Sequence, residues 1–248
     1  MIALIDANDP RLAAAPGEPC VLAAIQGLAK TAGPGLRREF WLALDGDSRP
    51  AGAVCRTEGG VWATAMAPAA QETAAFLSAL GALPGTVDSV LAPFLPGDWR
   101  RCPVLEYRGA LPVETPCCTP SAMALVECNI SAGAIPPWDR DALYAELHLR
   151  LRRGAAQVFL APDGDGKPAA GAATLLGERH AVIGWLACRR ERQGRGHGTA
   201  ALLAAVRGAM EQGKTPLLAC REELAAFYIA RGFFLAGEVW ERGALLSR

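Results

Sequence analysis

A glycine-rich loop between an apolar run and a helical pattern constrains this chain more than any other feature. The loop reads Gln193-Gly194-Arg195-Gly196-His197-Gly198. The apolar residues 181–188 before it predict a buried strand, and the apolar spacing within residues 199–210 predicts a helix. Glycines let the main chain approach a ligand closely, and the first N–H groups of a helix have no partner inside it. The order strand, loop, helix therefore predicts a main-chain site for an anion.

The loop is also basic, which favours a phosphorylated ligand. Arg189, Arg190, Arg192 and Arg195 lie close together, and only Glu191 opposes them. Guanidinium groups and the N-terminus of a helix both favour negative charge. We expect a cofactor that carries phosphate.

Three kinds of glycine loop bind phosphate after a strand. A Walker loop ends in Gly-Lys followed by Ser or Thr, whereas here Gly198 is followed directly by Thr199, so this interpretation fails. A dinucleotide fingerprint places G-x-G-x-x-G at the end of the strand, with an acidic residue about 20 positions on. Glu222 would supply that acid, which keeps the alternative open. However, the spacing here is G-x-G-x-G, and the charged run 189–192 separates the glycines from the strand.

The third kind fits best. Gln193-x-x-Gly196-x-Gly198 resembles the Q/R-x-x-G-x-G/A motif of the GNAT superfamily of N-acetyltransferases. Residues 227–233, F-Y-I-A-R-G-F, are similar to the family's F-Y-x-x-x-G-F pattern, and residues 216–220 between the two motifs predict a short strand. The resemblance covers about residues 123–242. Arg190 stands where the family often has proline, and Arg221 where many members carry an asparagine that binds the pantetheine arm.

The resemblance implies that acetyl-coenzyme A is the donor and that no metal is needed. It implies main-chain contacts from the end of the strand to the pantetheine arm and the acyl carbonyl, and a loop that holds the pyrophosphate. The cofactor-binding residues so implied are Leu186, Ala187, Cys188, Gln193, Gly194, Arg195, Gly196, His197, Gly198, Thr199 and Arg221.

The resemblance also implies direct attack of an amine on the thioester. Tyr228 is then the candidate general acid, because a phenol is protonated at neutral pH and can give its proton to sulfur. The alternative is that Tyr228 only packs. In a regular strand His180, Gly184 and Cys188 share one face, which makes His180 a candidate base through water. The alternative for His180 is a surface residue at the end of a hairpin.

Charge and composition narrow the setting. The 25 basic and 25 acidic residues cancel, so no global field favours nucleic acid or anionic membranes. The start of the chain lacks the pattern of a secretory leader, and no apolar run is long enough to span a membrane. The eight cysteines include no C-x-x-C pair, so we expect reduced thiols and a cytoplasmic location.

Two halves of the chain resemble each other. The stretch 45–53, which begins Asp-Gly-Asp, recurs as 163–172, and each copy predicts a hairpin because Asp-Gly is a strong turn signal. Arg108-Gly109-Ala110-Leu111 likewise matches Arg242-Gly243-Ala244-Leu245. The first half has no glycine loop; its strand 61–65 leads directly into a helix near 71–80.

We therefore expect an α/β fold of two tandem GNAT-like domains, each a mixed, mostly antiparallel sheet flanked by helices. Residues 1–114 would form a degenerate domain without a pyrophosphate loop, and 121–248 the acetyl-CoA-binding domain, joined by the proline-rich segment 112–120. This arrangement resembles that of the mycothiol synthases. The alternative is that the first half is an unrelated α/β region.

Within the second half we expect strands at 124–129 and 181–188, a helix at 139–153 and a hairpin at 157–176. A strand near Leu217, a short helix with Tyr228 and a last strand at 237–240 would complete the domain. The predicted function is transfer of an acetyl group from acetyl-CoA to a primary amine of a small molecule or peptide, by a monomer or homodimer. The alternative is a non-catalytic sensor of acyl-CoA or a protein-interaction module.

Overall fold

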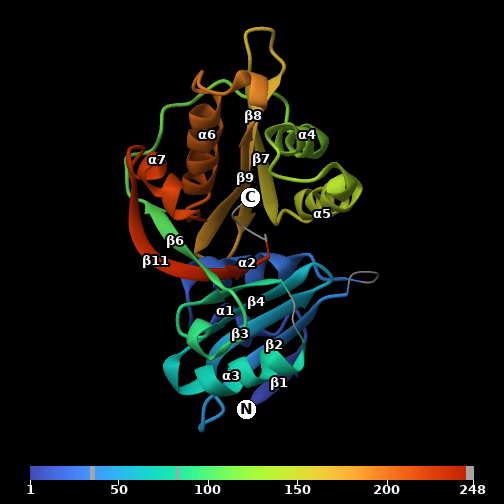
Figure 1. Cartoon of the computed structure of the whole chain (residues 1–248), viewed down its shortest axis with the longest axis vertical. Helices are drawn as coiled ribbons and strands as arrows, with labels where there is room; N and C mark the ends of the chain where they lie inside the picture. Colours follow the sequence, from blue (N-terminus) through green and yellow to red (C-terminus); the bar gives the residue numbers. More distant parts are fainter. Residues whose placement is uncertain (34–36, 82–83, 244–248) are drawn as a thin grey trace. The chain divides into compact units, whose positions relative to one another are not determined.

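The computed structural model describes residues 1–33, 37–81 and 84–243. Contacts divide the chain into two compact units, shown in Figure 1. Unit 1 holds residues 1–106 and the described residues from 219 onward, and unit 2 holds residues 107–218. The C-terminal residues from 219 are thus grouped with the first half of the chain, whereas the sequence predicts that they belong to the second domain.

Unit 1 is a sheet with helices on both faces. Along β4, alternate residues Val61, Ala63 and Ala65 pack in a core with α3, while Thr64 on the other face contacts the start of α2. Its elements are β1 (Ile2–Ile5), α1 (Pro10–Ala13), α2 (Pro19–Lys30), β2 (Glu39–Leu44), β3 (Pro50–Thr57), β4 (Gly60–Ala65), α3 (Ala67–Ala79), β5 (Gly85–Asp88), η1 (Ala92–Phe94), β6 (Arg100–Tyr107), η4 (Glu222–Leu224), α7 (Ala225–Ile229) and β11 (Phe233–Arg242).

The last strand of the chain completes the sheet of unit 1. The order of strands there is β1-β2-β3-β4-β5-β11-β6. β11 pairs antiparallel with β5, with Val239 opposite Asp88 and Glu241 opposite Thr86. Val239 is fully buried. The strand expected at 237–240 therefore exists, but its partner lies in the first half of the chain rather than in the second.

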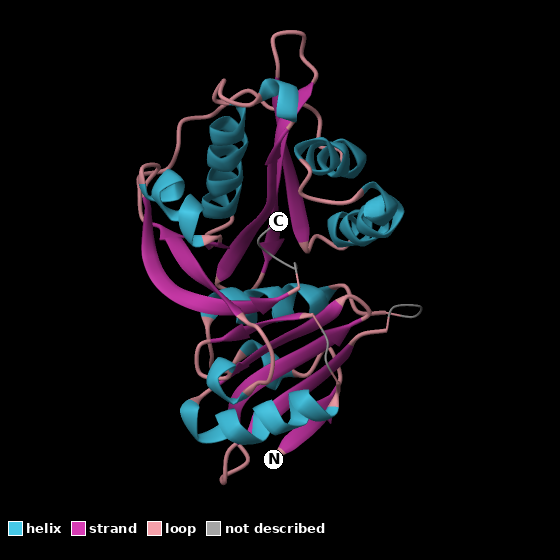
Figure 2. Cartoon of the chain, in the orientation of Figure 1, coloured by secondary structure: helices cyan, strands magenta, loops and turns pink. Residues whose placement is uncertain are grey.

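Unit 2 is a smaller sheet between helices. Its strand order is β10-β9-β8-β7, with α6 on one face of β7, β8 and β9 and α4 and α5 on the other (Figures 1 and 2). Its elements are α4 (Ala122–Ala132), η2 (Pro137–Asp139), α5 (Arg140–Arg152), β7 (Ala156–Pro162), β8 (Pro168–Leu176), β9 (His180–Cys188), η3 (Arg190–Arg192), α6 (His197–Glu211) and β10 (Thr215–Ala219).

One element of unit 2 contradicts its prediction. Residues 124–129 lie in helix α4, not in a strand. The Ser121 side chain accepts a hydrogen bond from the Ala124 N–H and caps the helix, and Gly133 ends it in a left-handed conformation with φ 76°. These start and stop signals outweigh the short apolar run. The helix, hairpin and strands expected elsewhere in this region are present, with shifted ends.

The repeated sequence forms the same turn twice. At Asp45 the carboxylate accepts hydrogen bonds from the N–H groups of Asp47 and Arg49, and Asp163 accepts the matching pair from Asp165 and Lys167. Both hairpins also carry a register shift just before the turn. The equivalence of the two hairpins therefore extends to hydrogen bonds. In the second sequence match, Ala244 and Leu245 lie outside the described residues.

Two acidic side chains, the half-buried Glu18 and the buried Asp88, lie near the start of α2 in unit 1. The Glu18 carboxylate caps α2 by accepting from the Val21 N–H at 2.9 Å. Glu18 N–H donates to Thr64 Oγ1, whose hydroxyl donates to Asp88 Oδ2 at 2.6 Å. Burial raises the pKa of Glu18 to about 7, and the Asp88 charge adds to the effect. Burial likewise raises the pKa of Asp88.

The raised pKa of Glu18 predicts that the stability of the folded protein depends on pH. The folded-state pKa of Glu18, about 7, lies above its ordinary value of 4.5. The stabilising contribution of the protonated form is thus complete below pH 4.5 and lost as the pH rises through about 7. We expect Glu18→Gln to raise the melting temperature at pH 8 and to change it little at pH 4.5 in thermal unfolding. A variant that is destabilised more at pH 8 than at pH 4.5 would contradict this expectation.

Candidate functional site

The glycine loop joins β9 to α6 in unit 2 as the sequence predicts. Gly194 and Gly196 adopt φ angles of 76° and 85°, and a Cβ at either position would meet no atom within 4 Å. The left-handed region costs other residues about 1–2 kcal/mol. Glycine therefore both permits the bend and leaves the main chain open to a ligand.

The N-terminus of α6 presents main-chain donors at this bend. Its first internal hydrogen bond runs from the Ala200 N–H to the Gly196 carbonyl at 3.0 Å, and no side chain caps the helix. Burial raises the pKa of the Cys188 thiol, and a hydrogen bond from the Gly198 N–H opposes that rise. Cys188 is therefore a protonated thiol packed under the bend, and the amide ends of a 15-residue helix are directed at the loop.

Two of the four loop arginines lie against other groups of the protein. Arg192 forms an ion pair with Asp163 at 2.9 Å, and the Arg189 guanidinium partly offsets the rise that burial causes in the pKa of the Cys128 thiol. In the described part of the chain, no acidic side chain pairs with Arg190 or Arg195, and Arg195 is exposed. These two guanidinium groups are available to the charge of a phosphate.

Gln193 has a structural contact in addition to its predicted role. Its Nε2 donates to the Cys188 carbonyl at 3.2 Å. The side chain thus ties the loop back onto the end of β9, which fixes the path of the main chain through Gly194 and Gly196.

A β-bulge interrupts β9 just before the loop. Gly184 pairs with Ala173 and Ala187 with Gly171, so Trp185 and Leu186 together oppose a single residue of β8. Trp185 is left-handed, with φ 51°. The extra residue shifts the side-chain alternation by one position. The expectation that His180 and Cys188 share a face is therefore wrong: Cys188 faces α6, and His180 falls on the other face.

His180 is also remote from the loop along the strand. It begins β9, opposite Thr215 of β10, eight residues before Cys188. At about 3.3 Å per residue this separation is roughly 26 Å. The structure does not bring His180 together with the other predicted site residues of unit 2.

The pairing of β9 with β10 ends before β9 reaches the loop. The two parallel strands pair at three positions, from His180–Thr215 to Val182–Leu217, and in the described chain the pairing ends there. β9 continues to Cys188, so its main-chain groups beyond Val182 on this side are not used by β10. The part of β9 nearest the loop is therefore not paired with β10.

The equivalent position in unit 1 is closed. β4 and β5 also pair at three positions, ending at Ala63–Val87. Immediately beyond, the buried Asp88 carboxylate accepts from the Ala65 N–H at 2.7 Å and from the Thr64 hydroxyl. In unit 1, Asp88 thus binds a main-chain and a side-chain donor of β4 just beyond its last pair with β5.

The two other predicted site residues belong to unit 1. Tyr228 lies in α7, is 9% exposed and packs edge-on against Phe227 and Phe233. Burial raises its pKa to about 12, with a further rise from Cys220 and an opposing effect of Arg231. Arg221 precedes η4 and is exposed.

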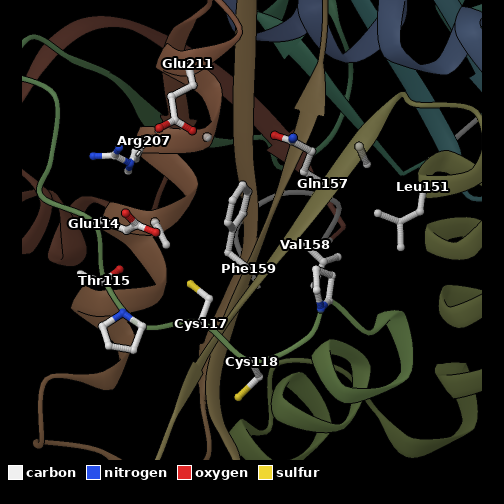
Figure 3. Close-up of a pocket in the computed structure, with 15 residues that line it drawn as sticks. Glu114, Thr115, Cys117, Cys118, Leu151, Gln157, Val158, Phe159, Arg207 and Glu211 are labelled. Carbon is white, nitrogen blue, oxygen red and sulfur yellow. Dashed lines mark ion pairs between the residues drawn. The ribbon is translucent and has the colours of Figure 1, made fainter.

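A groove of about 900 Å³ lies elsewhere in unit 2 (Figure 3). Phe159 of β7, Arg207 and Glu211 of α6 and the segment 114–118 line it. Arg207 pairs with Glu211 at 2.8 Å and donates to the Pro112 carbonyl at 2.9 Å. The predicted site residues do not line this groove. The groove lies where the proline-rich segment 112–120 runs past β7, the edge strand of the sheet.

Two absences concern the described residues only. Over 1–33, 37–81 and 84–243, no helix has the length and apolar character needed to cross a bilayer. The same residues contain no group of His, Cys, Asp and Glu side chains arranged to hold a metal ion.

Comparison with known proteins identifies the second half of the chain. Residues 124–233 match the family model described as the Acetyltransferase (GNAT) family. The second half of the chain is therefore similar to the acetyltransferases of this family, whose reaction is acyl transfer. No curated protein matches the sequence.

Solved structures resemble the whole chain at low identity. A tandem GNAT protein from the clavulanic acid biosynthesis pathway aligns over 99% of each chain, with TM-score 0.59 and 13% identity. A GCN5-related N-acetyltransferase from Sphaerobacter thermophilus aligns over 98% of this chain and 95% of its own, with TM-score 0.57 and 15% identity. One from Kribbella flavida covers 79% and 88%, with TM-score 0.53 and 16% identity. These likenesses establish the fold alone.

The loop geometry predicts a sharp effect of charge at Gly196. We expect Gly196→Asp to raise the Kd of coenzyme A by roughly 100-fold, about 2.7 kcal/mol, because a carboxylate would enter the anion site. Isothermal titration calorimetry measures the change.

Gly166 offers a matched control. It has φ 76° and the same open surroundings, but it lies in the β7–β8 turn. Gly166→Asp introduces the same strain and charge and should leave the Kd within about twofold. Equal losses of affinity in the two variants would mean that strain, rather than a phosphate site, explains the effect.

Proposed function

We propose that this protein transfers the acetyl group of acetyl-CoA to a primary amine of a small molecule or peptide. The observation that carries the proposal is the open main chain in unit 2: two left-handed glycines, the uncapped start of α6 and the unpaired end of β9. These features provide a site for a pyrophosphate next to a site for an extended chain, the two parts of coenzyme A that a GNAT domain must hold.

Each part of the donor has its own protein groups. Within residues 193–199, the amides of the bend at Gly194 to Gly196 would face the pyrophosphate, with Arg195 adding charge and His197 and Thr199 lining the first turn of α6. The main chain of Leu186, Ala187 and Cys188 would bind the pantetheine arm. Arg221 would lie at the position of the family's pantetheine-binding asparagine.

The reaction forms a C–N bond and breaks the C–S bond of the thioester. The amine attacks the carbonyl carbon, and a fixed main-chain N–H in residues 186–188 stabilises the oxyanion. Collapse of the tetrahedral intermediate expels the thiolate, which takes a proton, and the amine nitrogen loses one. Holding donor and amine side by side supplies much of the acceleration through proximity.

Tyr228 would deliver the proton to sulfur. With a pKa of about 12 its phenol remains protonated throughout the physiological range. A thiol has a pKa near 8.5, so complete transfer from such a phenol is uphill, and the group acts best as a hydrogen-bond donor to the developing thiolate. His180 remains a prediction for the base, although its place at the far end of β9 argues for release of the amine proton to water instead.

In the tandem interpretation, the first half of the chain is a GNAT-like domain that does not hold the donor. Residues 1–114 would be a degenerate GNAT-like domain and 121–248 the acetyl-CoA-binding domain. The matched hairpins at Asp45 and Asp163 support this interpretation. In unit 1 the Asp88 carboxylate already accepts from the Ala65 N–H. This contact supports the binding of one donor molecule per chain. We further propose a cytoplasmic protein that acts as a monomer or homodimer.

Tyr228→Phe tests the catalytic part of the proposal. We expect kcat in a thiol-release assay with an amine panel to fall by about 100-fold, because the developing thiolate would lose a hydrogen bond, and bonds to charged groups contribute on that scale. The Kd of acetyl-CoA should change little.

Tyr107→Phe is the control, since the Tyr107 hydroxyl donates to the Ala110 carbonyl and has no predicted part in catalysis. Unchanged turnover in Tyr228→Phe would remove Tyr228 from the mechanism. Tight donor binding by the wild-type protein without acetylation of any amine would favour the sensor alternative.

A further inference from the structure

The β-bulge of β9 requires a backbone conformation that its residue does not favour. Trp185 is a bulky L-residue with φ 51°. In the described chain, Trp185 and Ser48 are the two non-glycine residues with a positive φ. A left-handed tryptophan persists only where the surrounding structure holds it. The groups that hold it are found in α4 and α5.

Asn129 of α4 contacts the bulge directly. Its side chain is 1% exposed, and Nδ2 donates to the Trp185 carbonyl at 3.0 Å and to the Leu125 carbonyl at 3.0 Å. Among the described residues, none donates to its Oδ1. The hydrogen bonds that Asn129 makes to the protein through its side chain are thus those of Nδ2.

The indole ring is held from α5. The Arg150 guanidinium lies 5.8 Å from the centroid of the Trp185 ring, and Arg150 is itself fixed by Glu146 at 2.7 Å. A cavity of about 10 Å³ remains between the ring, Asn129 and Leu147. This space is about that of one water molecule, so Asn129 does not line a site for a substrate.

Peptide geometry connects Asn129 to the acyl-transfer site. The carbonyl of Trp185 and the N–H of Leu186 belong to one planar trans peptide and point in opposite directions. Because Asn129 draws the carbonyl towards α4, the Leu186 N–H is turned away from α4. Leu186 itself packs with α6 residues, on the opposite face from Asn129.

We propose that Asn129 is a positioning residue for acyl transfer: by gripping the Trp185 carbonyl, it orients the Leu186 N–H as the donor to the thioester carbonyl oxygen. The inference rests on the proposed function and adds to it a residue outside the glycine loop. Asn129 touches neither donor nor amine, and it acts through the direction of one peptide group.

Asn129→Leu removes the donor at nearly constant volume and also removes the unsatisfied Oδ1. We expect kcat to fall about 10- to 100-fold, the scale of a misplaced reacting group, with the Kd of coenzyme A within about twofold. Infrared spectra with carbonyl-labelled [¹³C]acetyl-CoA give a readout that needs no turnover. The wild-type protein should shift the thioester stretch to lower frequency, and Asn129→Leu should lose the shift.

Glycine at the bulge provides a rescue. Because glycine adopts positive φ without strain, the loss of Asn129 should matter less in a Trp185→Gly background. We expect the kcat ratio for Asn129→Leu to shrink there to about threefold or less. The exposed Asn8 contacts only Asp6 in the described structure, so Asn8→Leu serves as the matched control and should behave as wild type.

A retained infrared shift with unchanged kcat would overturn the proposal. A parallel loss of coenzyme A affinity, or failure of both Asn129→Leu and Asn129→Ala to fold, would also overturn it, since Asn129 would then be structural. If the wild-type protein shifts the thioester stretch but acetylates no amine, the proposed function fails, and the infrared comparison still decides the role of Asn129.

Discussion

The main-chain bend between β9 and the start of α6 is the constraint on which the site depends. Main-chain N–H groups are costly to bury without a partner and are normally satisfied. Unit 1 satisfies a main-chain donor of β4 internally, through the Asp88 carboxylate on Ala65. Unit 2 has no such carboxylate on its β9 donors in the described residues and instead places glycines and arginines there. The same β-strand geometry therefore yields a closed polar core in one half and an open anion site in the other.

Two local backbone devices shape the open site. Glycine allows the left-handed turns at Gly194 and Gly196 without strain, whereas the left-handed Trp185 is held by hydrogen bonding and ring contacts from α4 and α5. The left-handed glycines determine where a pyrophosphate can approach. The left-handed Trp185 determines the direction of the peptide group before Leu186. Helices on the face of the sheet away from α6 thus influence groups that would meet the donor.

The sequence predicted what local patterns encode. The strand, glycine loop and helix around residues 181–210, the two Asp-Gly hairpins and the short helix with Tyr228 are all present. A short apolar run such as 124–129 is compatible with a strand or a helix, and the Ser121 and Gly133 caps that decide for helix α4 lie outside it. Pairing of β11 with β5 and the bulge at Trp185 could not be read, because both depend on partners distant in sequence. The bulge in turn removed His180 from the face of Cys188, which regular alternation had predicted.

The stoichiometry of coenzyme A binding tests this account most directly, since it compares the two halves in one experiment. Calorimetric titration of the purified full chain should give one site per polypeptide, with heat that depends on the open main chain of unit 2. A second site of similar affinity would contradict the expectation that Asp88 prevents coenzyme A from binding to unit 1. The absence of any binding would contradict the account of the glycine loop itself.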